Sequence, residues 1–280
     1  MTAEIALMGI VNATPDSFSD RQRAKSFDEL AVRAHELAAA GATMIDVGGE
    51  SGRTDRAAVP VDQEIDRVAP LVARLAAEGL TVSVDTWRAP VARAALAAGA
   101  SIVNDVSGLS DPAVADACAA EGASLVITHT RVPPKVKGFP EYEDVVADVI
   151  GLLGERAAEA EARGVAREAL VFDPGIDLAK TPAESIELLR RLPELAALGG
   201  PLLVAVSRKD FVGALTGRPP AARDAGTLAA IDRAVEGGAS ILRVHDVAAA
   251  RDYLLVRAAL RGDGAEGRLD LAEHLRREAV

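Results

Sequence analysis

The amino-acid sequence predicts a single-domain α/β protein folded as a closed (β/α)8 barrel, the TIM-barrel architecture. Short β-branched runs alternate with longer alanine-rich amphipathic stretches throughout the chain, a pattern typical of repeated βα units. Eight such units can be counted, and 280 residues is enough for eight units with modest additions. An open doubly wound sheet is the main alternative, but no G-x-G-x-x-G sequence follows the first expected strand.

The expected strands are short and rich in Val, Ile and Leu. In chain order they cover residues 5–11, 43–47, 81–85, 101–105, 124–128, 170–173, 202–206 and 241–244. Helices are expected between them, for example over residues 27–40, 61–78 and 90–98. Several helices are followed by a glycine, which can end a helix in a left-handed conformation and return the chain to the sheet. These glycines are Gly41, Gly99, Gly122 and Gly238.

No stretch of the chain has the composition of a linker between domains. We therefore expect one barrel over residues 1–262 and a charged, helical C-terminal extension over residues 263–280. Residues 131–140 contain three prolines and two lysines, and we expect them to form a long loop after the fifth strand.

Composition excludes several classes of partner. With 42 acidic and 31 basic residues the net charge is -11, which opposes binding to nucleic-acid phosphates or to an anionic membrane surface. No uncharged stretch approaches the roughly 20 residues of a membrane span. Cys118 is the only cysteine, which excludes an intramolecular disulfide and a multi-cysteine metal site. We expect a cytoplasmic protein.

Polar residues stand at the expected carboxyl end of every strand, where barrels carry their active sites. They are Asn12, Asp46, Glu50, Asp85, Asn104, Asp105, His129, Asp173, Ser207, Arg208, Lys209, Arg243, His245 and Asp246. Any single one could be a helix N-cap. Lys209, Arg243 and His245, however, are poor caps, and cations near helix N-termini are unfavourable unless an anion is present. The pattern therefore indicates an anionic ligand.

The basic residues belong to the seventh and eighth strands, where barrels commonly bind phosphate. Arginine can hold phosphate oxygens with its planar fork, and lysine acts as a point charge. The alternative is that Arg208, Lys209 and Arg243 form ordinary surface ion pairs with Asp210 and Asp246.

The acidic and amide side chains of Asp85, Asn104 and Asp173 come from the third, fourth and sixth strands. They could accept hydrogen bonds from an amino-pyrimidinone edge, which offers an amine beside a ring N–H. Backbone capping in the barrel mouth is the equally weighted alternative. We expect these acceptors on one flank of the mouth and the cations on the other. A metal site made of His129, Asp46 and Asp85 is a weaker hypothesis, because no H-x-H or H-E-x-x-H spacing is present.

Seven short sequences then strongly resemble the dihydropteroate synthase family. They are MGIVNATPDSFSD (8–20), DVGGES (46–51), SVDT (83–86), NDVS (104–107), DPGI (173–176), SRK (207–209) and RVHDV (243–247). The resemblance runs in order from Met8 to about Leu260. It implies a barrel transferase, usually a homodimer, that joins 6-hydroxymethyl-7,8-dihydropterin pyrophosphate to 4-aminobenzoate in folate biosynthesis.

The resemblance also implies roles for single residues. Asp85, Asn104, Asp173 and Lys209 match positions that hold the pterin ring, and Asp85, Asp173 and Lys209 are the catalytic candidates. Arg53, Arg243 and His245 match the diphosphate-binding positions. Asn12 matches a ligand of the Mg²⁺ ion on the diphosphate, and Ser207 matches a residue near the aminobenzoate carboxylate.

The chain departs from the family pattern on the second-substrate side. Gly52 replaces the usual threonine, and the usual Gly-Phe-Gly-Lys is replaced by Asp-Leu-Ala-Lys at 177–180. An alternative hypothesis is therefore a divergent paralogue that binds a pterin but has another second substrate or a non-catalytic role.

Overall fold

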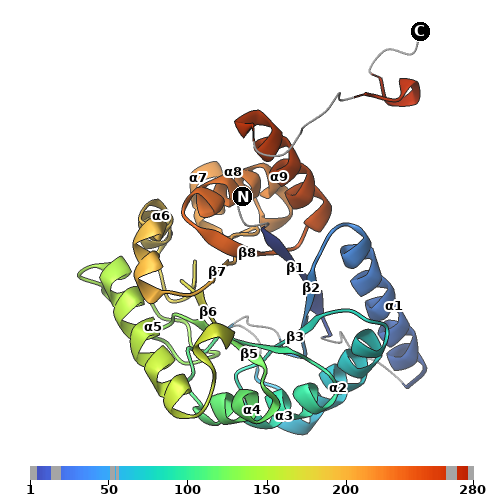
Figure 1. Cartoon of the computed structure of the whole chain (residues 1–280), viewed down its shortest axis with the longest axis vertical. Helices are drawn as coiled ribbons and strands as arrows, with labels where there is room; N and C mark the ends of the chain where they lie inside the picture. The colour runs from blue at the N-terminus through green and yellow to red at the C-terminus, as the bar shows by residue number, and fades with distance from the viewer. Residues whose placement is uncertain (1–4, 14–19, 51–53, 55–56, 263–269, 277–280) are drawn as a thin grey trace.

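The structure, a computed structural model, describes residues 5–13, 20–50, 54, 57–262 and 270–276. Eight parallel strands form a closed barrel in sequence order, and β8 pairs with β1 to complete it (Figure 1). The strands are β1 (Ala6–Asn12), β2 (Met44–Gly48), β3 (Val82–Asp85), β4 (Ile102–Asp105), β5 (Ser124–Thr128), β6 (Leu170–Asp173), β7 (Leu202–Val204) and β8 (Ala239–Val244). The predicted (β/α)8 fold is confirmed.

Helices surround the ring of strands (Figure 1). They are α1 (Asp20–Ala39), α2 (Val61–Ala77), α3 (Ala89–Ala97), α4 (Ala113–Glu121), α5 (Val145–Ala162), α6 (Pro182–Arg190), α7 (Asp210–Thr216), α8 (Asp224–Glu236) and α9 (Val247–Arg261). Short 3-10 turns lie at Arg167–Ala169, Leu192–Leu198, Pro220–Ala222 and Glu273–Leu275. Gly122 caps α4 with φ 63° and ψ 27°, the left-handed conformation expected from the sequence.

The seventh and eighth strands differ most from the expectation, since β8 begins at Ala239 rather than Ile241 and β7 is shorter than expected. The seventh strand ends at Val204 rather than Val206, and its pairing with β8 shifts register between Leu202 and Leu203. The irregularity releases residues 205–209 from the sheet before α7 begins. These residues include three of the polar positions singled out in the sequence.

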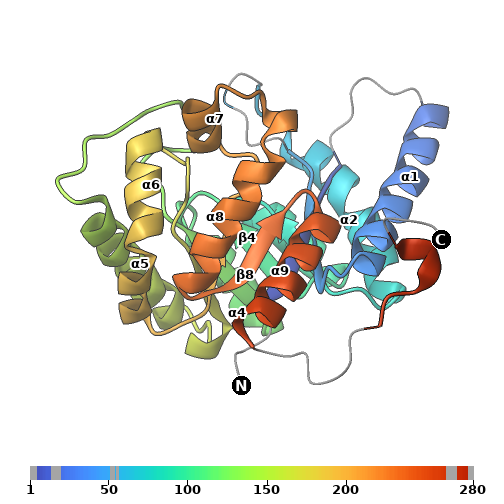
Figure 2. The same ribbon diagram turned by 90° about the horizontal axis from the view of Figure 1, so that it is seen from above.

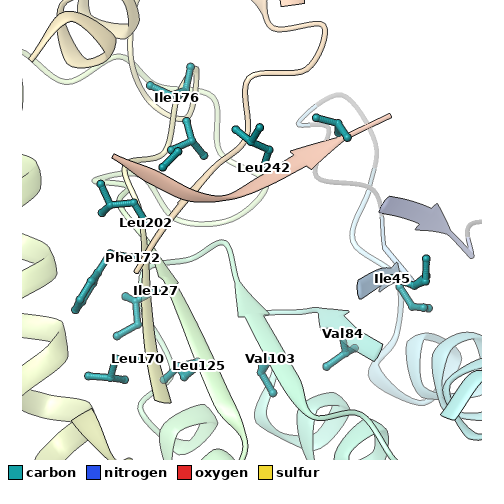
Figure 3. Close-up of a cluster of buried hydrophobic side chains, with 14 of the residues drawn as sticks. Ile45, Val84, Val103, Leu125, Ile127, Leu170, Phe172, Ile176, Leu202 and Leu242 are labelled. Atoms are coloured by element: carbon teal, nitrogen blue, oxygen red, sulfur yellow. The ribbon is translucent and has the colours of Figure 1, made fainter. Parts of the chain in front are cut away.

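Side chains on the strands alternate between two cores. Ile45, Val84 and Phe172 belong to a large cluster between sheet and helices, shown in Figure 3. Met8, Val126 and Leu203 belong to a small cluster inside the barrel. Residues two positions further along a strand face the same interior. The inner apolar layer is therefore followed, toward the strand ends, by an inner polar layer.

The carboxyl ends of the strands lie at the end of the barrel that carries α7, toward which the arrow of β8 points in Figure 2. No helix among the described residues is long and apolar enough to cross a membrane. Of the expected C-terminal extension, the described part is residues 270–276, which contain one 3-10 turn.

Candidate active site

A cavity of about 880 Å³ opens at the carboxyl ends of the strands. Seven of the nine site residues predicted from the sequence line it, namely Asn12, Asp85, Asn104, Asp173, Lys209, Arg243 and His245. Ser207 lies behind the lining and contacts His245. Arg53 lies outside the described residues, as does Gly52. The expected gathering of side chains at a single rim is therefore observed.

The acidic and basic flanks are not separate, which corrects the expected arrangement. Arg243 crosses the barrel interior from β8, where its Nε donates to Asp46 (2.7 Å) and its Nη2 donates to Asp85 (2.8 Å). Burial disfavours the charge on Arg243, but the two carboxylates outweigh burial and raise its pKa. Burial raises the pKa of Asp85 to about 7, and the nearby guanidinium opposes that rise. An internal ion pair thus joins the two flanks.

Asp46 lies beneath the cavity and is fully buried. Besides Arg243, it accepts hydrogen bonds from Ser83 Oγ (2.6 Å) and from Asn104 Nδ2 (3.0 Å). Because the amide of Asn104 donates to Asp46 through Nδ2, its Oδ1 is buried without a hydrogen-bond partner. Asn104 lines the cavity, so a ligand N–H could satisfy this oxygen.

Asp173 ends β6 and Lys209 directly precedes α7, and both line the mouth of the cavity. Asp173 is buried and accepts from the backbone N–H of Gly175 (2.7 Å). Burial raises its pKa, and Lys209 opposes the rise. Lys209 Nζ donates to the carbonyl of Ile176 (2.7 Å), and burial lowers its pKa. Within the part of the chain that the structure describes, both charged groups therefore keep hydrogen-bonding capacity for a ligand.

Ser207 and His245 form a pair next to Arg243. The backbone N–H of His245 donates to Ser207 Oγ (3.3 Å), and that hydroxyl lies 2.9 Å from His245 Nδ1. If the hydroxyl donates to Nδ1, Nε2 carries the proton and can donate to a ligand. Burial, with help from Arg208 and Arg243, lowers the pKa of His245 to about 4. The ring is thus a neutral donor at pH 7.

Arg208 does not share in this cluster. Its φ is 59°, and its Nε donates to Asp224 on α8 (2.9 Å). The surface pairs suggested by the sequence also differ, because Asp210 pairs with Arg223 and Asp246 caps α9 through Ala249 N. Arg208 is the one basic residue of the predicted phosphate group that is turned toward a helix.

Residues 175–180 after β6 form one wall of the cavity, which we call the β6 loop. Asp177 and Ala179 have φ values of 62° and 53°. These are the two positions at which the family pattern has glycine, and glycine adopts this conformation without strain. Gly175 also has positive φ, and a Cβ built there would lie 2.1 Å from the carbonyl oxygen of His129.

Lys180 holds the β6 loop together. Its buried Nζ lies 2.9 Å from His129 Nδ1 and donates to the carbonyls of Gly175 (3.0 Å), Leu178 (3.1 Å) and His129 (3.3 Å). Burial lowers the pKa of Lys180 to about 7. Burial also lowers the pKa of His129 to about 4, and Lys180 adds to this effect. His129 Nε2 in turn lies 2.8 Å from Asp148.

The loop after β5 lines the cavity next to the β6 loop, and its Tyr142 hydroxyl donates to the carbonyl of Ala179 (3.0 Å). It carries Lys135, whose Nζ forms an ion pair with buried Glu50 at the end of β2 (2.9 Å). Arg88 pairs with both Glu50 (2.9 Å) and Glu64 (2.6 Å), and its guanidinium stacks over Trp87. The loop expected after the fifth strand is thus connected, through the Lys135–Glu50 ion pair, to the chain just after β2.

The described residues contain no group of three or more His, Cys, Asp or Glu side chains that could hold a metal ion. The suggested site of His129 with Asp46 and Asp85 is therefore not formed, since His129 contacts Lys180 and Asp148 instead. Asn12 is exposed at the end of β1. A Cβ built at Gly48 would lie 3.8 Å from both Asn12 Oδ1 and Asp85 Oδ2, so the absence of a side chain there leaves a space between two oxygens.

Three site residues were not predicted from the sequence in the role they have. Asp46 was considered only as a metal ligand, although it stands two residues after inward-facing Met44. Lys180 and Trp87 lie in loops beyond the ends of β6 and β3. The alternation along a strand does not predict where side chains in such loops point. The D-V-G-G-E-S sequence contained a signal for Asp46, and the lysine shared with the family pattern at 177–180 contained one for Lys180.

Comparison with known proteins gives a consistent result. Residues 8–245 match the family described as pterin binding enzyme. The dihydropteroate synthase of Mycobacterium leprae is 43% identical over 263 residues, covering 91% of this chain and 93% of that protein. The solved structure of Xanthomonas albilineans dihydropteroate synthase with 4-aminobenzoic acid superimposes with a TM-score of 0.85 at 43% identity, covering 93% and 94% of the chains. The same enzyme in complex with 7,8-dihydropteroate gives a TM-score of 0.83 at 42% identity, covering 94% and 96%.

Proposed function

Because the chain belongs to the dihydropteroate synthase family of pterin-binding enzymes, we propose that its cavity performs the reaction of that family. The protein is a transferase that condenses 6-hydroxymethyl-7,8-dihydropterin pyrophosphate with 4-aminobenzoate, giving 7,8-dihydropteroate and pyrophosphate. The observation that carries the proposal is the pairing, in one cavity, of buried acceptors for a pterin with cations for a diphosphate. The similarity to dihydropteroate synthases over more than nine-tenths of the chain does not favour the alternative of a non-catalytic paralogue.

The pterin half of the site is formed by Asp85, Asn104, Asp173 and Lys209. The unpartnered Oδ1 of Asn104 accepts an N–H of the pterin ring, and the carboxylates of Asp85 and Asp173 accept from the amine and a second ring N–H. Lys209 donates to a ring acceptor. These bonds fix the exocyclic methylene carbon at the diphosphate side of the cavity.

The diphosphate half is formed by Arg243 and His245, with Arg53 as a further cation. When the bond between the methylene carbon and the diphosphate oxygen breaks, the electron pair leaves with pyrophosphate. Arg243 and the Nε2–H of His245 stabilise that charge. The amine nitrogen of 4-aminobenzoate attacks the methylene carbon, and the proton lost from nitrogen passes to solvent or to the departing pyrophosphate.

Ser207 orients His245 through the bond to Nδ1 and lies on the side where the aminobenzoate carboxylate would sit. Leu178 and the rest of the β6 loop provide the apolar wall against the second substrate. The carboxylate of 4-aminobenzoate is a second anionic group, besides the diphosphate, for the cations at the mouth of the cavity.

We also propose that Mg²⁺ binds with the diphosphate, held by the carboxamide oxygen of Asn12. The donor set fits, because Mg²⁺ commonly takes one or two protein oxygens together with substrate phosphates and water. The space above Gly48 between Asn12 and Asp85 supports this placement. The bound ion would neutralise charge on the leaving diphosphate.

A homodimer and a cytoplasmic location are further proposals. Leu255, Val256 and Leu260 on α9 are 58%, 59% and 84% exposed, which suits contact with a second copy. Analytical ultracentrifugation is expected to give about twice the chain mass, and a monomer at micromolar concentration would contradict the dimer. The cytoplasmic location rests on the single cysteine of the sequence.

The proposed reaction is tested by an assay with the pterin pyrophosphate, Mg²⁺ and 4-aminobenzoate. We expect dihydropteroate and pyrophosphate in equal amounts, with pyrophosphate release dependent on 4-aminobenzoate. Lys209→Met serves as the site variant, and Arg93→Met, at an exposed position of α3 that does not line the cavity, serves as its control. Pyrophosphate release that is independent of 4-aminobenzoate, or none at all, would refute the proposal.

A further inference from the structure

Asp46 is a buried carboxylate to which no part of the proposed reaction assigns a role. Its side chain is fully buried and does not line the cavity. It accepts from three strands at once, through Ser83 on β3, Asn104 on β4 and Arg243 on β8. A buried carboxylate survives only when donors compensate for its desolvation, and these three bonds provide them.

Two of the three donors belong to different halves of the site. Asn104 lies in the pterin half and Arg243 in the diphosphate half. An ionised carboxylate only accepts hydrogen bonds, so the amide of Asn104 must turn Nδ2 toward Asp46. Its Oδ1 then faces the cavity as an acceptor. Asp46 thereby decides which end of the amide a pterin meets.

For Arg243 the two carboxylates have unequal positions. Asp46 is fully buried and binds Nε, whereas Asp85 lines the cavity and binds Nη2. A pterin that bonds to Oδ2 of Asp85 would compete with Nη2 and free it for the diphosphate. The bond from Nε to Asp46 is out of reach of the ligand, so the guanidinium stays in place during the exchange.

We propose that Asp46 is a positioning residue that presents the carbonyl oxygen of Asn104 and the guanidinium of Arg243 to the two ends of one substrate. The proposal rests on the proposed function, since it concerns the same pterin and diphosphate halves. Asp46 itself touches neither substrate. Its effect should therefore appear in the affinities for a pterin and for pyrophosphate, measured separately. It should not appear in the KM for 4-aminobenzoate.

The direct test is Asp46→Asn, which keeps the shape but removes the negative charge opposite Arg243. Its one acceptor oxygen cannot bond to Ser83 and to the Oδ2 partners Asn104 and Arg243 at the same time. Calorimetry with Mg²⁺ and inorganic pyrophosphate, and separately with a pterin lacking the diphosphate, is expected to show at least a tenfold loss of affinity for each. KM for 4-aminobenzoate is expected to stay within threefold of the wild type. Ser83→Ala removes the third donor alone and is the matched control, with affinities within threefold of the wild type.

A double-mutant cycle separates positioning from general damage. If Asp46 acts on pyrophosphate through Arg243, Asp46→Asn has no further effect on pyrophosphate affinity in an Arg243→Ala background. Additive losses would overturn the proposal, as would wild-type affinities in folded Asp46→Asn. Failure of the wild-type enzyme to form dihydropteroate would instead refute the proposed function.

A second measurement needs no Asp46 variant and so covers the case in which Asp46→Asn does not fold. The Nε–H resonance of Arg243 in the wild-type protein, assigned through its loss in Arg243→Lys, is followed by NMR. It is expected to remain protected from exchange with water when pyrophosphate, Mg²⁺ and a pterin are added. Exchange as fast as that of exposed arginines would overturn the proposal.

Discussion

The strand side of the cavity, made of Asp46, Asp85, Asn104 and Arg243, is built differently from the β6 loop on the other side. On the strand side every polar group stands on a regular strand and finds its partner across the sheet. The β6 loop instead holds two non-glycine residues at positive φ and is tied by one buried lysine. The register of the sheet therefore fixes the strand side. The β6 loop depends instead on the hydrogen bonds of Lys180 and contains a strained backbone. Four experiments test this difference.

The largest effect is expected for Arg243→Ala. Loss of the guanidinium removes charge stabilisation from the leaving diphosphate, so kcat/KM should fall by about 100- to 1000-fold. Buried Asp46 also loses its charged partner, and the free energy of unfolding should fall by about 3 kcal/mol. Steady-state kinetics and denaturant unfolding measure the two effects. Arg257→Ala, which breaks a pair with Asp232 between α8 and α9, is the control and should leave activity within twofold.

Lys180→Met should affect the β6 loop alone. The change leaves three carbonyls and His129 Nδ1 without a donor, so the free energy of unfolding should fall by about 2–4 kcal/mol. Because this wall faces the second substrate, KM for 4-aminobenzoate should rise more than KM for the pterin substrate. Equal rises in the two KM values would contradict the assignment of the β6 loop to the second substrate. Arg93→Met, at an exposed position of α3 outside the cavity, is the control.

The pH dependence of the free energy of unfolding should also report on the β6 loop, through His129, which contacts Lys180. His129 titrates at about 6.5 when unfolded and about 4 when folded, so between these values only the unfolded chain takes up the proton. Its contribution is complete above pH 6.5 and is lost as the pH falls toward 4, by about 2–3 kcal/mol. The raised pKa values of Asp85 and Asp105, about 7 and about 6, have the opposite sign.

The comparison of wild type with His129→Gln isolates the histidine from those carboxylates. Denaturant unfolding at a series of pH values should show a stability difference that shrinks as the pH falls from 7 to 4. Parallel curves for the two proteins would mean that His129 does not titrate as its burial beside Lys180 requires.

The smallest effect is expected for Ala179→Gly. Glycine adopts the φ of 53° without a Cβ penalty, so the free energy of unfolding should rise by about 0.5–1 kcal/mol. Ala158→Gly on the exposed face of α5 should lower it by about 1 kcal/mol. If both substitutions destabilise the protein, the β6 loop is not strained at this position.

The same difference explains what could be predicted from the sequence. Asp85, Asn104 and Arg243 follow the period of two along short strands, so the eight βα units were enough to bring them to one rim. The pairing of Arg243 with Asp46 and Asp85 could not be predicted, because it depends on side-chain reach across the barrel. The directions of Arg208 and Lys180 depend on loop backbone angles, which no strand or helix period encodes.

Gly175 gives this cavity one position that no directed-evolution library can vary. Any β-carbon there would meet the His129 carbonyl oxygen at 2.1 Å, far inside the sum of the van der Waals radii of carbon and oxygen. If residues 175–180 were randomised and selected for growth without folate, every surviving clone should encode glycine at 175. Codons 177 and 179 should vary more, because Asp and Ala already occupy the positive φ values there. Variants at these positions could be screened for other amines as second substrate.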